Sequence, residues 1–70
     1  MEYELTTKIR ELRAVLNISQ EELAIKVGVR RETIARLEKG MYNPSLKLAV
    51  DIAKVFGKNV EEVFFFGEKE

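Results

Sequence analysis

The stretch from Ser19 to Gly40, SQEELAIKVGVRRETIARLEKG, decides how this chain is interpreted. Ser19 stands three residues before Glu22, a capping-box pattern in which hydroxyl and carboxylate each satisfy a free amide at a helix start. Apolar residues then recur at helical spacing in two groups: Leu23, Ala24 and Val27, then Ile34 and Leu37. Gly28 ends the first helix and Gly40 the second. The stretch predicts two short helices joined by a tight turn, over about residues 19–39.

The second of these helices, residues 31–39, is basic within a chain that is neutral overall. The protein has 12 Lys and Arg against 12 Asp and Glu. Residues 26–47 hold six basic residues against two acidic ones, whereas each flank holds three basic residues against five acidic ones. Charge clustering alone is equally consistent with a chance fluctuation, so the place of these residues in the fold has to decide whether they meet nucleic acid.

A further helix is predicted before this pair. Its apolar stripe is Ile9, Leu12 and Leu16. Thr6 or Thr7 is the expected N-cap, because a hydroxyl accepts from a free amide of the first turn. Asn17 suits a left-handed C-terminal position, because its short polar side chain tolerates positive φ.

Two helices and extended-favouring ends complete the expected fold. Ser45 caps a fourth helix, Gly57 closes it, and Asn59 opens a short fifth helix. The residues expected in the core by periodicity are Ile9, Leu12, Leu16, Ile18, Leu23, Val27, Val29, Ile34, Leu37, Leu46, Ile52 and Phe56. The termini, Met1 to Leu5 and Phe64 to Phe66, allow a small antiparallel ribbon. We expect one all-α domain over residues 1–70, with that ribbon as its only possible sheet.

Composition excludes several functional classes. The chain has no Cys and no His, so the commonest general base, the thiol nucleophile and the best zinc ligands are absent. We therefore expect no enzyme, no metal site, no cofactor and no small-molecule ligand. No apolar stretch approaches the roughly 20 residues of a membrane span, and the start lacks a signal-peptide pattern. The expected location is the cytoplasm, on the nucleoid when the protein is bound to DNA.

Several short runs carry a family resemblance. They are Ser19-Gln20-Glu21-Glu22-Leu23-Ala24, Gly28-Val29, Thr33-Ile34, Leu37-Glu38-Lys39-Gly40 and Asn43-Pro44-Ser45-Leu46. Together they resemble the Cro and phage-repressor (XRE-like) family of helix-turn-helix regulators, nearest to short stand-alone dimeric repressors such as the cytolysin repressor. The resemblance covers about residues 8–64. It implies a five-helix lambda-repressor-like fold and a homodimer that presents two recognition helices to double-stranded DNA.

The expected base-contacting residues lie on the recognition helix, residues 31–39. Arg31 and Arg36 can each grip guanine with two parallel hydrogen bonds, Glu32 can accept from cytosine, and Ala35 can touch a thymine methyl. For each of them a solvated or purely structural role is the alternative. The residues expected at phosphates are Gln20, Arg30, Lys39, Met41, Tyr42 and Asn43, with Arg10 and Lys47 as weaker candidates. Arg30 departs from the family, which often has Ser or Thr at this N-cap.

Two further sets of residues have expected structural roles. The resemblance implies a partly buried ion pair between Arg13 and Glu38. Apolar residues of the segment 46–67 are expected to form the dimer interface: Leu48, Val55, Val60, Val63, Phe65 and Phe66. The alternative is that they fold back onto their own monomer. Three consecutive phenylalanines cannot all point inward, and Phe64 is the one expected in the core.

The leading hypothesis is a dimeric DNA-binding regulator, a repressor of a short inverted-repeat operator. Two alternatives use the same fold. An antitoxin would need a tail for its toxin, for which residues 67–70 are too short. A protein-interaction module would expect a neutral or acidic recognition helix, whereas this one is basic.

Overall fold

The computed structural model describes residues 3–68, which form five helices and two strands. In chain order the elements are β1 (Tyr3–Thr7), α1 (Ile9–Leu16), α2 (Gln20–Val27), α3 (Arg31–Glu38), α4 (Leu46–Phe56), α5 (Val60–Val63) and β2 (Phe64–Glu68). The expected all-helical class and the terminal ribbon are both confirmed. Of the predicted N-terminal extended segment, Met1 and Glu2 lie outside the described residues. None of the described helices is long and apolar enough to cross a membrane.

The helix ends follow the local signals in the sequence, with one exception. Ser19 and Glu22 form the expected capping box, and the Ser45 hydroxyl accepts from the Leu48 amide at 3.1 Å. Asn17 has a positive φ of 56° at the end of α1. The expected N-cap position of α1 at Thr6 or Thr7 is wrong, because both threonines belong to β1 and Lys8 occupies the cap; the Thr7 hydroxyl nevertheless accepts from the Ile9 amide at 3.4 Å.

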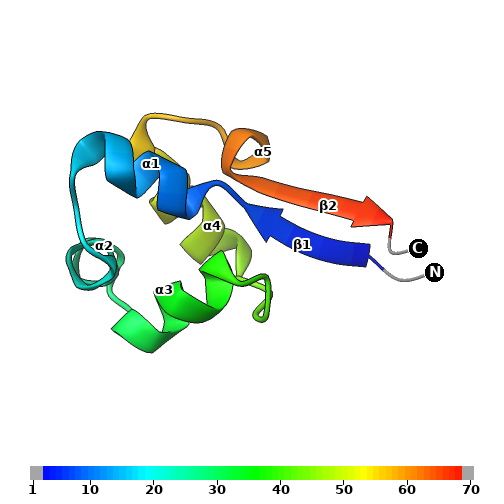
Figure 1. The fold of residues 1–70 in the computed structure, drawn as a ribbon, viewed down its shortest axis with the longest axis horizontal. Coiled ribbons are helices and arrows are strands. Elements are labelled where there is room, and N and C mark those ends of the chain that lie inside the picture. Colours follow the sequence, from blue (N-terminus) through cyan, green and yellow to red (C-terminus); the bar gives the residue numbers. More distant parts are fainter. Residues whose placement is uncertain (1–2, 69–70) are drawn as a thin grey trace.

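The β1–β2 ribbon is antiparallel, with Leu5 opposite Phe66 and Thr6 opposite Phe65. It projects from the helical body (Figure 1). Its base is closed by a hydrogen bond from the Lys8 amide, just after β1, to the Val63 carbonyl at the end of α5, 2.9 Å long. Gly40, at the end of α3, lies against the Leu5 backbone so closely that a Cβ there would collide with the carbonyl. The ribbon is thereby seated against α3 and continuous with α5.

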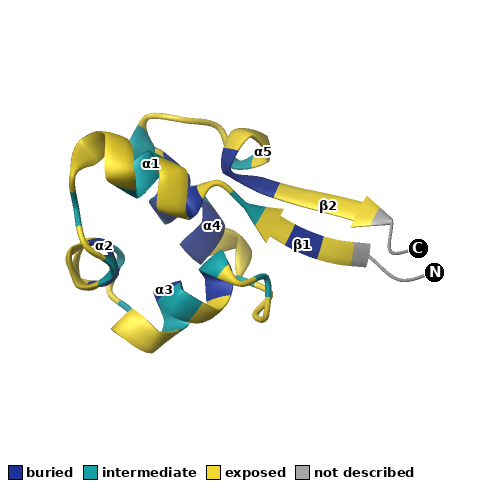
Figure 2. Ribbon diagram, viewed as in Figure 1, coloured by how far each residue is buried: buried dark blue, intermediate teal, exposed yellow. Residues whose placement is uncertain are grey.

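The core lies where all five helices and the base of the ribbon meet (Figure 2). Its members are Leu5, Ile9, Leu23, Ala24, Ile34, Leu37, Leu48, Ala49, Ile52, Ala53, Val63 and Phe64. Two residues expected there are exposed instead. Leu16 is in the last turn of α1, and Leu46, 78% exposed, is in the first turn of α4 at the edge of its buried stripe. Periodicity identifies a face of a helix, but the neighbouring elements must reach its end turns to bury them.

Candidate nucleic-acid interface

Helices α2 and α3 form the expected helix-turn-helix, with eight residues in each helix. Gly28 makes the turn with a φ of 74°, a left-handed conformation that glycine adopts without a Cβ penalty. The two helices pack against each other, and α2 also packs on α4. Helix α3 forms one side of the body, whereas α1 and α5 lie on the other (Figure 1). The outer surface of α3 is therefore available to a large ligand.

Helix α3 has a buried face and an exposed face, with Thr33, Ala35 and Glu38 half-buried between them. Ile34 and Leu37 are fully buried and anchor the helix. Arg31, Glu32 and Arg36 are exposed, and Ala35 is half-buried between them; these are the four residues expected at bases. The structure thus brings all four to the accessible part of one short helix.

Two hollows flank α3, and basic residues line both. One, of about 310 Å³, is lined by Arg10, Arg13, Gln20, Ala35, Glu38 and Lys39. The other, of about 280 Å³, is lined by Arg30, Glu32, Thr33, Arg36 and Tyr42. From the sequence, Arg10 is only a weaker phosphate candidate, with a solvated role as the alternative. The fold joins Arg10, Gln20 and Lys39 around one hollow.

The expected ion pair between Arg13 and Glu38 is present and ties α1 to the end of α3. Arg13 Nε donates to Glu38 Oε2 at 2.6 Å, and Nη2 donates to Oε1 at 3.2 Å. The side chains are only 16% and 8% exposed, respectively. Hydrogen bonding to Glu38 and its negative charge raise the pKa of Arg13 above its ordinary value, although partial burial opposes the shift. This pair is bidentate and largely removed from water.

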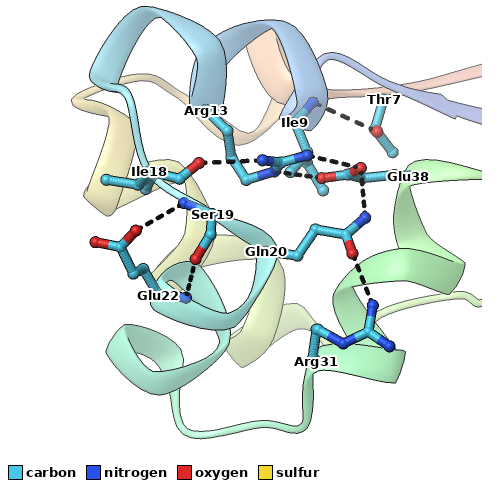
Figure 3. A network of polar contacts seen from close by, with 9 residues as sticks. All are labelled: Thr7, Ile9, Arg13, Ile18, Ser19, Gln20, Glu22, Arg31 and Glu38. Carbon is cyan, nitrogen blue, oxygen red and sulfur yellow. Dashed lines mark hydrogen bonds and ion pairs between the residues drawn. The ribbon is translucent and has the colours of Figure 1, made fainter.

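The ion pair continues into a longer polar network (Figure 3). Arg13 Nη1 also donates to the Ile18 carbonyl at 3.0 Å. Gln20 Nε2 donates to Glu38 Oε1 at 3.0 Å, and Arg31 Nη1 donates to Gln20 Oε1 at 3.1 Å. Sequence reasoning treated the pair, Gln20 and Arg31 as three separate features. One feature of the sequence could have indicated that these side chains meet: Gln20 and Arg31 are each the first residue of a helix in the helix-turn-helix.

Of the phosphate contacts expected near the two ends of α3, one is corrected by the structure. Arg30 occupies the N-cap without a side-chain capping hydrogen bond, so its exposed guanidinium is free to line the hollow beside Arg36. Lys39, Tyr42 and Asn43 are exposed beyond the other end. The Met41 amide was expected to be available to a phosphate, but it donates to the Arg36 carbonyl at 2.9 Å and closes the helix instead.

The expected dimer residues divide into buried and accessible ones. Leu48 and Val63 are in the core of the monomer, so the expectation that they lose surface on dimerisation is wrong. Val55 and Val60 are half-buried at the edge of the core. Phe65 and Phe66 are exposed, with the Lys8 ammonium 5.5 Å from the centre of the Phe65 ring. Phe66, at 62% exposed, has the most apolar surface of the set.

Two packed short helices with a tight glycine turn, the second presenting exposed basic residues, define a helix-turn-helix protein. Residues 9–63 match the profile of the helix-turn-helix family. An HTH-type transcriptional regulator of Archaeoglobus fulgidus is 61% identical over 66 residues, covering 94% of this chain and 93% of the relative. The chain belongs to the helix-turn-helix family and is a transcriptional regulator of that type.

Two more distant proteins agree with this assignment. The transcriptional repressor RstR of the cryptic phage CTXphi, from Vibrio cholerae, is 36% identical over 58 residues, covering 83% of this chain and 52% of the repressor. The restriction-modification controller protein C.AhdI from Aeromonas hydrophila has a TM-score of 0.71 at 33% identity, covering 79% of this chain and 80% of its own. The resemblance inferred from the sequence is confirmed.

Proposed function

We propose that this protein binds a short inverted-repeat operator as a homodimer, with α3 in the major groove, and represses transcription there. The observation that carries the proposal is the arrangement around α3: an exposed helix surface with a basic hollow on each side. A helix in the major groove lies between the two DNA strands, so each of its sides faces the phosphates of a different strand. The two hollows match that geometry and the chemistry that phosphates require.

The outer surface of α3 supplies the proposed base contacts. Arg36 and Arg31 are exposed and can each donate two hydrogen bonds to a guanine, the commonest specific contact in this groove. Glu32 accepts from a cytosine amino group, and Ala35 lies close enough to the surface to meet a thymine methyl. The guanidinium groups provide most of the discrimination, because a lost bidentate contact leaves a base edge unpaired.

The hollows supply the proposed phosphate contacts, which set register rather than sequence. On one side Arg10, Gln20 and Lys39 face the same strand. An amide nitrogen carries two donors, so the one that Gln20 gives to Glu38 leaves another for a phosphate oxygen. On the other side Arg30 and Tyr42 face the second strand. Asn43 extends this contact beyond the helix.

The dimer forms through accessible apolar residues of the segment 46–67. With Leu48 and Val63 in the core, the proposed contacts are Phe66 and Phe65 on β2, together with the half-buried Val55 on α4 and Val60 on α5. A two-fold axis there sets the two α3 helices about 34 Å apart, one turn of DNA. Occupation of such a site blocks other proteins from it, and the likeness to a phage repressor supports repression as the outcome.

Selection of bound sequences from a random DNA pool tests the function. We expect an inverted repeat with half-sites about 10 base pairs apart, centre to centre. Affinity should fall steeply with salt, with a slope of about −0.9 in log K against log salt for each phosphate neutralised. Arg36→Ala should relax the preference at one base pair. Lys54→Ala removes another exposed basic residue, from α4, and serves as the matched control. A pool with no enriched motif contradicts the proposal.

Light scattering tests the dimer. Phe66→Glu places a charge in the proposed interface and should yield a protein of monomer mass, because an unpaired buried carboxylate is costly. Val15→Glu changes an even more exposed apolar residue on α1, away from the ribbon, and should leave the mass unchanged. A monomeric wild type, or a dimeric Phe66→Glu variant, rules out this interface.

A further inference from the structure

A single chain of hydrogen bonds runs from the partly buried ion pair to the exposed surface of α3. Glu38 accepts from Gln20 Nε2 at 3.0 Å, and Gln20 Oε1 accepts from Arg31 Nη1 at 3.1 Å. The three side chains come from the end of α3, the start of α2 and the start of α3. Figure 3 shows them in succession, from Glu38 beside Arg13, through Gln20, to Arg31.

The chemistry of the chain imposes a direction on it. An ionised carboxylate only accepts hydrogen bonds, so it can face only the nitrogen of the Gln20 amide. The amide oxygen must then point the other way, toward the start of α3. Only a donor fits there, and Arg31 supplies it. Glu38 thereby determines which end of the amide meets Arg31.

Glu38 is itself held firmly enough to serve as the reference point. Its side chain is 8% exposed, and Arg13 grips both of its oxygens. Arg13 is fixed in turn by the Ile18 carbonyl, between α1 and α2. In contrast, the Arg31–Gln20 bond is exposed to water, and such a bond is weak unless its acceptor is already oriented.

We propose that Glu38 is a positioning residue for DNA reading: through the Gln20 amide it orients the Arg31 guanidinium before DNA arrives. This rests on the proposed base contact of Arg31. A preoriented arginine loses less conformational freedom when it meets its base, so discrimination at that base pair increases. The buried ion pair therefore has a part in specificity as well as in stability.

The test uses two variants that break the chain at different points. Arg13→Met combined with Glu38→Met removes the carboxylate and its partner together, so no buried charge is left unpaired. Gln20→Met removes the amide and leaves the ion pair in place. The base pair read by Arg31 is the one at which Arg31→Ala relaxes the preference, and the affinities for all four bases are compared there. In DNA-free protein, NMR relaxation of the Arg31 Nε–H group reports its order directly.

We expect both variants to reduce discrimination at that base pair by roughly threefold to tenfold in the wild-type background, and neither to change it further in an Arg31→Ala background. The Arg31 Nε–H group should become mobile in both. Ile52→Val, a truncation of a fully buried residue outside the network, should change neither readout and controls for lost stability. Unchanged discrimination in the two variants, or equal order of Arg31 in them and the wild type, overturns the inference. If Arg31→Ala relaxes no position, the base contact has failed, and the DNA-free measurement still decides whether Glu38 orders Arg31.

Discussion

Two ion pairs of the described chain have almost the same length and very different surroundings. Arg13 lies 2.6 Å from Glu38 and joins α1 to α3, whereas Lys47 lies 2.7 Å from Asp51 one turn along α4. The first pair is 16% and 8% exposed, and the second 85% and 32%. Distance is therefore a poor guide to what each contributes. Water around Lys47 weakens its attraction to Asp51. Arg13 and Glu38 have instead lost most of their hydration and form hydrogen bonds with each other.

Loss of one buried partner should have the largest effect. Glu38→Ala leaves the Arg13 guanidinium without its carboxylate in a site with little water, and it also removes the acceptor of Gln20. We expect the free energy of unfolding to fall by about 3–5 kcal/mol. Chemical denaturation at neutral pH measures it. A decrease of less than about 1 kcal/mol in the free energy of unfolding would mean that water reaches the site more than its exposed fraction indicates.

Loss of both buried partners separates the worth of the pair from the penalty of an unpaired charge. Arg13→Met with Glu38→Met should lie within roughly 1–2 kcal/mol of the wild type, because two apolar side chains need no compensation. The same denaturation experiment applies. A loss as large as that of Glu38→Ala alone would show that the pair contributes strongly by itself.

The exposed pair should matter little. Asp51→Ala is expected to lower the free energy of unfolding by roughly 0.3–0.5 kcal/mol, the usual value for a helical pair four residues apart. Added salt should remove this difference, since exposed charges are screened. A salt-insensitive loss would place Asp51 in some other interaction.

The smallest effect concerns an exposed carboxylate that acts in a helix cap. Hydrogen bonds with the Ser19 amide and hydroxyl lower the pKa of Glu22 below its ordinary value of 4.5. A lowered folded-state pKa contributes stability above 4.5 that is lost as the pH falls through the folded value. Glu22→Gln keeps an acceptor but does not titrate. Unfolding of both proteins across the acid range should show the wild-type advantage shrinking; a constant difference contradicts this origin. Arg13, whose pKa is raised, stays charged throughout this range.

Features that depend on groups close together along the chain could be predicted from the sequence. The caps at Ser19, Ser45 and Asn17 were predicted correctly, because each depends on groups within one helical turn. The core residues Ile34 and Leu37 followed from spacing for the same reason. Leu46 did not, because its burial requires another element to reach the first turn of α4, and none does.

The candidate site shows the same division. The sequence placed Arg31, Glu32, Ala35 and Arg36 on the accessible surface of one helix, because helical period alone separates them from Ile34 and Leu37. It could not reveal that the Met41 amide was already engaged by Arg36, nor that Phe66 stays accessible while Val63 is buried.

By itself, the sequence determined the helix-turn-helix, its glycine turn at residue 28 and its basic second helix, since all of these depend on neighbours along the chain. Only the tertiary structure decided that Arg10 shares a hollow with Lys39, and that Glu38 is linked through Gln20 to Arg31. These contacts join side chains on separate helices. Whether such groups meet depends on how the helices pack, and periodicity within one helix carries no information about the distance to another.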